Sequence, residues 1–274
     1  MPFIMGVINV TPDSFSDGGR YYRAPDAVAH ARRLIDEGAD VLDIGGESTR
    51  PGSDPVSPEE QIRRIGSVIR QVRSFWNGPI SIDTTRSQVA DAAIAAGADW
   101  INDISAMRDD PAMAEVARRN SCTVVLMHSQ GRPKTMQAAP RYDDAVVEVA
   151  EFLSSRAELA IAAGIPAERI ILDPGIGFGK SYDHNLALMT HLDVICSLGY
   201  PVLIGVSRKS FIGQITGAEL PDRLEGSLVA VVAAARLGAS IVRVHDVAAT
   251  KRALQTAGAL GLLSQPGSGP SSPQ

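Results

Sequence analysis

Short runs of β-branched and aliphatic residues alternate along the chain with longer stretches in which apolar residues recur at helical spacing. A strand that is buried on both faces has a nearly continuous apolar sequence, whereas a helix that covers a sheet has one apolar stripe. The apolar runs therefore predict eight strands, which cover residues 3–9, 41–45, 80–83, 100–104, 123–128, 170–173, 202–206 and 241–245.

Residues 58–73 illustrate the helical segments between these strands. Ser57 is a good N-cap, Pro58 suits the first turn, and Glu60 completes the sequence pattern of a capping box. This pattern predicts a helix whose apolar face packs against the strands. That face is formed by Ile62, Ile65, Val68, Ile69 and Val72.

A short turn sequence recurs where a predicted helix meets the next strand, at residues 38–40, 97–99 and 238–240. Each begins with Gly-Ala, and glycine suits the left-handed conformation just beyond a helix end. Repeated strand–helix units predict an α/β fold, a (β/α)8 TIM barrel formed as a single domain by residues 1–264. A doubly wound open sheet is the alternative, disfavoured because no G-x-G-x-x-G sequence follows the first strand. We expect residues 265–274, rich in Pro, Gly and Ser, to be a disordered tail.

Composition narrows the class of protein further. The chain has 274 residues, 45% apolar and 21% charged, which is typical of globular proteins and excludes disordered and fibrous chains. No apolar run approaches the ~20 residues of a membrane span, and no basic stretch precedes an apolar core at the N-terminus. The net charge of -5 argues against a nucleic-acid partner. Cys122 and Cys196 lack a C-x-x-C spacing, so we expect two core thiols and a cytoplasmic location.

Polar side chains lie at or just beyond the end of every predicted strand. In a barrel these ends meet at one face, where active sites are built. An isolated polar residue there is often a helix cap or turn former, and we assign that role to Asp103 and Asp246. His128 is either satisfied by a backbone group or in contact with a ligand. The remaining residues of this set are Asn9, Glu47, Arg50, Asp83, Asn102, Asp173, Ser207, Arg208, Lys209, Arg243 and His245.

The chemistry of these residues falls into two groups. Asp83, Asn102 and Asp173 offer carboxylate and amide edges, which suit a planar heterocycle rich in N–H and C=O groups, such as a purine or a pterin. Arg243 and His245 suit an anion, because the last two strands of such barrels commonly supply a phosphate site. The residues alone predict a heterocycle deep in the barrel and an anion at its rim.

Three further segments carry unusual sequences. Residues 11–19 and 47–54 are long, polar and punctuated by Gly and Pro, so they are either solvated connectors or mobile lids that bring Phe15 and Arg50 to the barrel. Residues 175–180, Gly-Ile-Gly-Phe-Gly-Lys, have the composition of a nucleotide-binding loop. They lack the G-x-x-x-x-G-K-[ST] spacing, so we do not assign ATP binding to them.

Seven stretches together resemble the dihydropteroate synthase family, in family order and along nearly the whole chain. They are residues 9–19 (NVTPDSFSDGG), 47–52 (ESTRPG), 81–84 (SIDT), 102–104 (NDI), 173–180 (DPGIGFGK), 207–213 (SRKSFIG) and 243–247 (RVHDV). This family of transferases condenses 6-hydroxymethyl-7,8-dihydropterin diphosphate with 4-aminobenzoate, giving 7,8-dihydropteroate and diphosphate with the help of Mg²⁺. The resemblance implies the same folate-pathway reaction here, a homodimer, and inhibition by sulfonamides, which mimic 4-aminobenzoate.

The resemblance also implies a role for each matching residue. The pterin is expected to contact Asp83, Asn102, Asp173 and Lys209. The diphosphate is expected to contact Asn9, Arg243 and His245, with Asn9 also facing Mg²⁺. The aminobenzoate is expected to lie beside Thr49, Pro51, Phe178, Lys209 and Ser210. The two loops are expected to contribute Phe15, Asp17 and Arg50. The catalytic residues expected from this assignment are Asp83, Lys209, Arg243, His245, Asp17 and Arg50.

The implied mechanism is SN1-like. The C–O bond to diphosphate breaks first, and Asp83 or Asp173 stabilises the cation that is delocalised into the pterin ring. Mg²⁺, Arg243 and His245 stabilise the departing diphosphate, and the two loops exclude water. The neutral amine of 4-aminobenzoate then attacks without a strong base.

Two other functions remain as alternatives. A methyltetrahydrofolate-dependent methyltransferase would use the same pterin residues, but it should lack the first-loop motif and the Lys209/Arg243 anion site, and it would need a corrinoid partner. A non-catalytic pterin-binding paralogue would tend to lose the loops or Asn9 while keeping the pocket.

Overall fold

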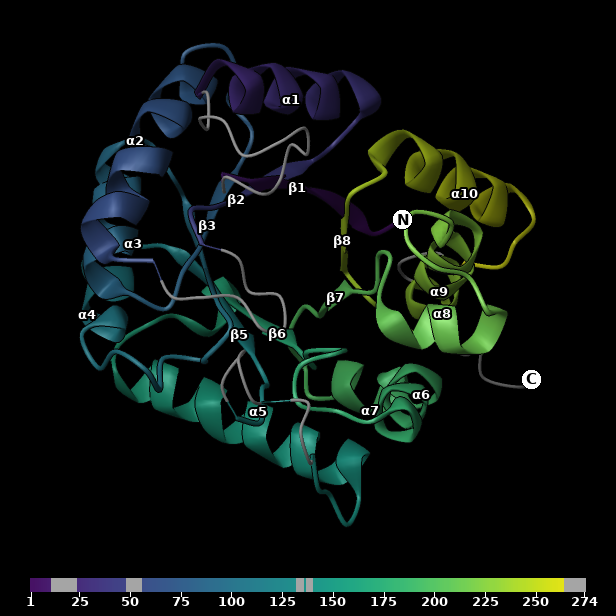
Figure 1. Cartoon of the computed structure of the whole chain (residues 1–274). Helices are drawn as coiled ribbons and strands as arrows, with labels where there is room; N and C mark the ends of the chain where they lie inside the picture. The colour runs from purple at the N-terminus through teal and green to yellow at the C-terminus, as the bar shows by residue number, and fades with distance from the viewer. Residues whose placement is uncertain (11–23, 48–55, 132–135, 137–139, 264–274) are drawn as a thin grey trace, which may run out of the picture.

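The computed structural model describes residues 1–10, 24–47, 56–131, 136 and 140–263, so the expected tail at 265–274 lies outside the described residues. The described residues form eight strands that alternate with helices (Figure 1). The strands are β1 (Phe3–Asn9), β2 (Val41–Gly45), β3 (Ile80–Asp83), β4 (Trp100–Asp103), β5 (Thr123–Met127), β6 (Ile170–Asp173), β7 (Leu203–Gly205) and β8 (Ile241–Val244). The helices are α1 (Ala24–Glu37), α2 (Pro58–Arg73), α3 (Ser87–Ala95), α4 (Met113–Arg119), α5 (Ala145–Ala162), α6 (Tyr182–Thr190), α7 (Leu192–Cys196), α8 (Ser210–Thr216), α9 (Leu224–Arg236) and α10 (Val247–Ala259), with a 3-10 turn at Ala167–Arg169.

The strands form one parallel sheet in the order β6-β5-β4-β3-β2-β1-β8-β7. The two ends of this order meet at a parallel bridge between Leu172 and Val202, next to a 2.9 Å hydrogen bond from the Leu172 N–H to the Pro201 carbonyl. The sheet is therefore a nearly closed barrel, and the helices surround it (Figure 1). The (β/α)8 prediction is confirmed, and the doubly wound alternative is wrong.

Four predicted strands are longer than the observed ones. β4, β5 and β8 each end one residue earlier than predicted, and β7 loses a residue at each end. The predicted residues that fall outside the observed strands lie where the chain enters or leaves the sheet, and some of their backbone groups bond to residues outside it. The Ile104 carbonyl, for example, accepts the hydroxyl of Ser129 at 2.9 Å. The polar strand ends thus start the loops that surround the barrel mouth.

The predicted helix at 58–73 is confirmed with its N-cap. The Ser57 hydroxyl accepts the Glu60 N–H at 3.3 Å. The Glu60 carboxylate, however, accepts from Arg63 and Arg64 at 2.7 Å each, so it is used within the helix rather than to close a capping box. The two arginines compete with the capping box because they occupy the carboxylate that the box would use.

The repeated Gly-Ala turns are confirmed at the N-terminal end of the barrel. Gly38, Gly97 and Gly238 have φ values of 98°, 116° and 107°, which only glycine adopts readily. In the first two turns the aspartate that follows accepts a strand N–H: Asp40 from Ile4 at 2.8 Å, and Asp99 from Ile80 at 2.9 Å. Each turn thus ends one helix and fixes the start of a neighbouring strand.

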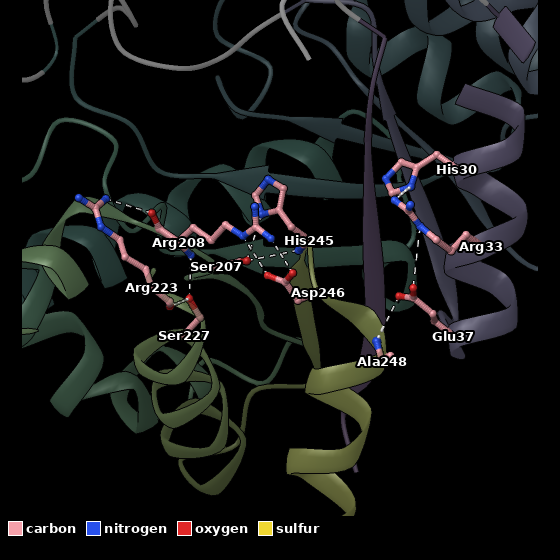
Figure 2. Close-up of polar contacts among 10 residues, drawn as sticks. All are labelled: His30, Arg33, Glu37, Ser207, Arg208, Arg223, Ser227, His245, Asp246 and Ala248. Atoms are coloured by element: carbon pink, nitrogen blue, oxygen red, sulfur yellow. Dashed lines mark hydrogen bonds and ion pairs between the residues drawn. The ribbon is translucent and has the colours of Figure 1, made fainter. Parts of the chain in front are cut away.

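The first and last units of the barrel meet at α1 and α10. The Glu37 carboxylate at the end of α1 accepts the Ala248 N–H of α10 at 3.3 Å (Figure 2). Arg33, one turn before Glu37, faces the same carboxylate at 3.9 Å. Among the described residues, no helix is long and apolar enough to cross a membrane.

Two apolar clusters form the core. The large one lies between the sheet and the helices. The small one fills the floor of the barrel and consists of Met5, Val41, Val125, Ile171, Leu203 and Ile241, with Trp100 packed against it. Side chains two positions apart on a strand face the same side, so the residues two positions after these point into the barrel above the floor. On four strands they are polar, namely Asp43, Asn102, Asp173 and Arg243. Together with the buried Ser81 and Asp83 of β3, we call these residues the polar layer.

Candidate active site

The polar layer is held together by Arg243, which reaches across the barrel from β8. Its Nε donates to Asp43 Oδ2 on β2 at 2.6 Å, and its Nη2 donates to Asp83 Oδ2 on β3 at 2.9 Å. Asn102 on β4 donates from Nδ2 to the same Asp43 oxygen at 3.1 Å. Charge-assisted bonds of this kind are among the stronger hydrogen bonds in proteins. Four side chains from four strands are therefore fixed relative to one another.

The polar layer contains more hydrogen-bonding oxygens than donors. Within the described part of the chain, four buried side-chain atoms have no hydrogen-bond partner, namely Asp43 Oδ1, Ser81 Oγ, Asp83 Oδ1 and Asn102 Oδ1. Such atoms are uncommon in native proteins because each costs about 1–3 kcal/mol. Their concentration above the barrel floor indicates a ligand that brings N–H or O–H donors to this layer. A planar heterocycle with N–H groups along its edge meets that requirement.

Burial dominates the electrostatics of the layer. It raises the pKa of Asp83 to about 7, against the opposing effect of Arg243 and with the help of the neighbouring charge of Asp43. Burial also raises the pKa of Asp173, although the Gly175 N–H donates to its Oδ1 at 2.7 Å. Burial would lower the pKa of Arg243, but Asp43 and Asp83 hold that pKa above its ordinary value. One guanidinium thus balances two buried carboxyl groups.

Lys209 lies beside the polar layer on the segment that follows β7. Its ammonium group donates to the Ile176 carbonyl and lies 4.5 Å from the centre of the Phe178 ring. Burial lowers the pKa of Lys209 to about 8, and attraction to Asp173 opposes that shift. The structure therefore brings together Lys209, Phe178 and Asp173, three residues of the expected site, and the aromatic face of Phe178 lies next to a cation.

His245 lies at the rim of the barrel, just beyond β8 (Figure 2). Its Nδ1 lies 3.0 Å from the Ser207 hydroxyl, which also accepts the His245 N–H at 3.3 Å. Arg208 follows with a left-handed φ of 59°, and its guanidinium donates to both carboxylate oxygens of Asp246 at 2.9 and 2.6 Å. The Arg208 N–H is held by Ser227 Oγ at 2.9 Å. These contacts fix the turn that carries Ser207 and Lys209.

Asn9 ends β1 at the same level as the polar layer. It pairs in register with Gly45, which pairs in turn with Asp83 on the next strand. A Cβ atom at Gly45 would lie 3.6 Å from the Asp83 Cβ and 3.9 Å from Asn9 Oδ1. The missing side chain of Gly45 therefore leaves Asn9 and Asp83 facing a common space at the barrel mouth.

The oxygen atoms near Asn9 determine which kind of metal site the described residues can form. No group of three or more His, Cys, Asp or Glu side chains lies close enough together among them to hold a metal ion. Mg²⁺ characteristically keeps several waters and binds through one or two protein oxygens together with substrate phosphates. An amide oxygen at this position fits an Mg²⁺ ion that is carried by a diphosphate.

The remaining predicted site residues divide into two sets. Ser210 lies exposed at the first position of α8, next to Lys209. The other set falls outside the described residues, and its roles stay predictions: Phe15, Asp17, Thr49, Arg50 and Pro51.

Two of the structural roles assigned from the sequence have different outcomes. Asp103 is a turn former as predicted, since its carboxylate accepts the Ser105 N–H and hydroxyl at 2.7 Å each and the Met107 N–H at 2.9 Å. Asp246 is the N-cap residue of α10, but its side chain makes no cap hydrogen bond, so of its two predicted roles the side-chain cap is wrong. The competing partner is Arg208, which offers two charge-assisted bonds.

His128 has a side-chain partner that neither of its two predicted environments included. It is buried at the end of β5, its Nδ1 lies 2.9 Å from the Lys180 ammonium group, and its ring packs edge-on against Phe152 at 4.8 Å. Burial and the Lys180 charge lower the pKa of His128 to about 3. The imidazole is therefore uncharged and acts as a partner of Lys180.

The sequence interpretation missed two members of the polar layer, Asp43 and Ser81. Both lie inside their strands rather than at the ends, which were the positions searched for function. The available signal was a carboxylate within the run Val41-Leu-Asp-Ile-Gly45, where an apolar side chain would be expected in a buried strand.

Comparison with known proteins gives one consistent result. The family described as "Pterin binding enzyme" matches residues 5–245. The dihydropteroate synthase of Neisseria meningitidis serogroup B is 53% identical over 267 residues, with 95% of this chain and 93% of the relative covered.

Solved structures agree with that match. A Xanthomonas albilineans dihydropteroate synthase with 4-aminobenzoic acid superposes with a TM-score of 0.90 at 49% identity, covering 96% of this chain and 94% of the other. A Yersinia pestis dihydropteroate synthase in a sulfonamide drug complex superposes with a TM-score of 0.89 at 42% identity, covering 95% and 94%. The likeness extends over nearly the whole barrel.

Proposed function

The chain belongs to the family of pterin binding enzymes, and on that premise we propose how its barrel carries out the dihydropteroate synthase reaction. This transferase reaction joins 6-hydroxymethyl-7,8-dihydropterin diphosphate to 4-aminobenzoate and yields 7,8-dihydropteroate and diphosphate. The methyltransferase and the non-catalytic paralogue are disfavoured, because the relatives that match over nearly the whole chain are dihydropteroate synthases.

The observation that carries the site assignment is the set of four unpartnered buried atoms in the polar layer. A dihydropterin presents ring N–H and amino groups along one edge, and these would donate to Asp83 Oδ1 and Asn102 Oδ1. Asp173 closes the opposite side of the layer at the end of β6. Binding of the pterin would thus satisfy atoms that the fold itself leaves unsatisfied, which makes the site specific for a donor-rich heterocycle.

The chemistry proceeds by departure of the diphosphate. The C–O bond of the hydroxymethyl group breaks, its electron pair stays on the diphosphate oxygen, and the positive charge spreads into the dihydropterin ring. The carboxyl groups of Asp83 and Asp173 lie where that charge develops, in a buried site where fixed charges act strongly. The amine lone pair of 4-aminobenzoate then forms the C–N bond, and the resulting ammonium group releases a proton.

His245 at the rim and Arg243 in the polar layer bind the diphosphate. His245, whose Nδ1 lies beside the Ser207 hydroxyl at the rim, would contribute its imidazole to binding of a phosphate oxygen. Two of the five N–H groups of Arg243 are used by Asp43 and Asp83, and the others can donate to the leaving group. Asn9 would hold a diphosphate-borne Mg²⁺, which supplies charge neutralisation of the leaving group when bound.

Lys209 and Phe178 form the aminobenzoate side. The ring of Phe178 offers a face for stacking, and the ammonium group of Lys209 supplies the charge that complements a carboxylate or a pterin carbonyl. Lys209 is also attracted to Asp173, which belongs to the pterin side, so this one side chain adjoins both substrates. This arrangement explains why 4-aminobenzoate is selected together with the pterin.

The reaction is tested by measuring diphosphate release from dihydropterin diphosphate and Mg²⁺, with and without 4-aminobenzoate. We expect release that depends on 4-aminobenzoate and yields 7,8-dihydropteroate. Pterin binding without any release would instead support the non-catalytic paralogue. Methyl transfer to a corrinoid would support the methyltransferase.

We also propose a homodimer in the cytoplasm. Apolar side chains are exposed on α8, α9 and the adjoining segment, among them Ile215, Leu220 and Val229, and Figure 1 places α8 and α9 next to each other on the barrel exterior. Both cysteines are free thiols, which favours a reducing compartment. Light scattering on the purified protein tests the dimer, and a monomer at micromolar concentration would contradict it.

A further inference from the structure

Lys180 is a buried ammonium group to which the reaction described above assigns no role. It lies at the end of the segment 174–180 that follows β6, and its side chain is 2% exposed. Its Nζ donates to His128 Nδ1 at 2.9 Å, to the His128 carbonyl at 3.3 Å and to the Phe178 carbonyl at 3.1 Å. A buried lysine is costly, so an arrangement that uses all three donors needs a reason.

The segment 174–180 lies directly on the end of β5. A Cβ atom at Gly175 would come within 2.0 Å of the His128 carbonyl oxygen, and one at Gly179 within 2.1 Å of the Gln130 carbonyl oxygen. Both glycines have left-handed φ values, 66° and 64°. Glycine is therefore required at both positions by backbone contact as well as by conformation. The Lys180 ammonium group ties together the same two stretches of backbone.

This contact governs the position of the aminobenzoate side. Between the two glycines lie Ile176, whose carbonyl accepts from Lys209, and Phe178, whose ring faces the Lys209 ammonium group at 4.5 Å. Lys180 holds the carbonyl of Phe178 itself. A shift of this segment would move the aromatic face and the Lys209 partner at once, while Asp83 and Asn102 stand on other strands.

We propose that Lys180 is a positioning residue, which clamps residues 174–180 onto the end of β5 so that Phe178 and the Ile176 carbonyl hold Lys209 in place for the aminobenzoate. The proposal rests on the assignment of Phe178 and Lys209 to that substrate. The pKa shifts agree with the geometry: burial lowers the pKa of Lys180 well below its ordinary value, with Asp173 opposing and the charge of Lys209 adding to the shift. The uncharged His128 ring is the acceptor that this lysine requires.

The test is Lys180→Met in the full chain, with Lys251→Met as the matched control. Lys251 lies exposed on α10, and its side chain lies beside Gly38. In Lys180→Met we expect the KM for 4-aminobenzoate to rise by about tenfold or more, since small misplacements at a reacting pair are costly. The affinity for dihydropterin diphosphate, measured by calorimetry without 4-aminobenzoate, should change much less, because Asp83 and Asn102 stand on other strands. Lys251→Met should match the wild type in both measurements.

A second variant separates positioning from stability. Lys180→Met combined with His128→Phe replaces both partners by apolar groups, which leaves no lone buried donor or acceptor between the two side chains. We expect the double variant to recover thermal stability but to keep the raised KM for 4-aminobenzoate.

Three results would overturn the proposal. They are an unchanged KM for 4-aminobenzoate in a folded Lys180→Met, an equal loss of affinity for both substrates, and failure of both variants to fold, which would make Lys180 a purely structural residue. Failure of the proposed function is distinguishable from all three, because it would show as a wild-type protein without release of diphosphate that depends on 4-aminobenzoate.

Discussion

Arg243 on the last strand and Asp43 on the second strand, 200 positions apart in the chain, are joined by a 2.6 Å hydrogen bond from Nε to Oδ2 in the middle of the barrel. Asp43 is fully buried, and its other partner is Asn102 on the fourth strand. Asp43 thereby fixes both a predicted anion-binding residue and a predicted pterin-binding residue. It is the residue around which the polar layer is organised, although it lies below the strand ends.

The buried carboxyl group of Asp83, which shares the Arg243 guanidinium with Asp43, predicts that the activity depends on pH. The raised pKa of Asp83, about 7, means that its carboxylate is protonated as the pH falls through neutrality. The protonated form loses acceptor capacity for the pterin, so kcat/KM for dihydropterin diphosphate should fall on the acid side of about pH 7. Asp43→Asn removes a neighbouring negative charge that raises this pKa, so the acid limb should move to lower pH.

Comparing Asp43→Asn with the wild type on one substrate cancels the effect of the ionisation of the substrate itself. An acid limb that stays in place in Asp43→Asn would contradict the coupling of the two carboxyl groups. The contribution of Asp83 to stability has the opposite pH dependence to its contribution to activity. Between its ordinary pKa and about 7, Asp83 holds a proton in the folded state that the unfolded chain releases, so this group makes unfolding easier as the pH rises.

Lys209→Ala should abolish most turnover. The ammonium group adjoins Asp173 and Phe178, so its loss removes a charge from the pterin side and from the aminobenzoate side together. We expect kcat/KM to fall by about 100-fold or more, the range seen when one preorganised electrostatic group is removed from a site. Steady-state kinetics on both substrates provide the measurement, with Lys251→Ala as control. Near wild-type kcat/KM would remove Lys209 from the site.

Sulfonamides should inhibit the enzyme in competition with 4-aminobenzoate. The basis is the shared geometry of the two molecules and the likeness of the whole barrel to the Yersinia pestis enzyme, whose structure is a sulfonamide drug complex. Inhibition should be relieved by raising 4-aminobenzoate and left in place by raising the pterin substrate. Full activity in a large excess of sulfonamide would contradict the assignment.

Gly175→Ala should destabilise the fold far more than Gly199→Ala. Both glycines have left-handed backbones, with φ values of 66° and 86°, so both substitutions carry a conformational cost of about 1–2 kcal/mol. At Gly199 a Cβ meets nothing within 4 Å, whereas at Gly175 it would overlap the His128 carbonyl oxygen at 2.0 Å. The overlap should add about 1–3 kcal/mol, measurable by urea unfolding. Equal losses in the two variants would show that residues 174–180 do not lie on the end of β5.

Most of the fold could be predicted from the sequence, and the residues whose roles were not predicted share a physical reason. The eight strands and the Gly-Ala turns follow from local patterns, because parallel strands are continuously apolar and a left-handed helix end demands glycine. Asp43 was missed because its role depends on a partner on the last strand. No local pattern indicates that Arg243 lies beside Asp43, because the two residues are brought together only when the barrel closes.

Dependence on a distant partner also explains why the roles of Asp246 and Lys180 were not predicted. A carboxylate before a helix usually caps that helix. Here the left-handed turn at Arg208 directs its guanidinium toward Asp246, so the carboxylate binds Arg208 instead of the helix N-terminus. The lysine at the end of the glycine-rich stretch resembled part of a nucleotide loop, yet its environment is set by the neighbouring strand end at His128. Contacts between loops on different strands are tertiary, so periodicity and spacing carry no trace of them.

The most direct measurement is a crystal structure of the chain with 7,8-dihydropteroate. The pterin should lie on the polar layer with its N–H groups within hydrogen-bond distance of Asp83 Oδ1 and Asn102 Oδ1, two of the atoms without partners in the protein alone. The benzoate should extend between Phe178 and Lys209. A pterin bound elsewhere, or one that leaves those two oxygens without donors, would contradict the role assigned to the polar layer.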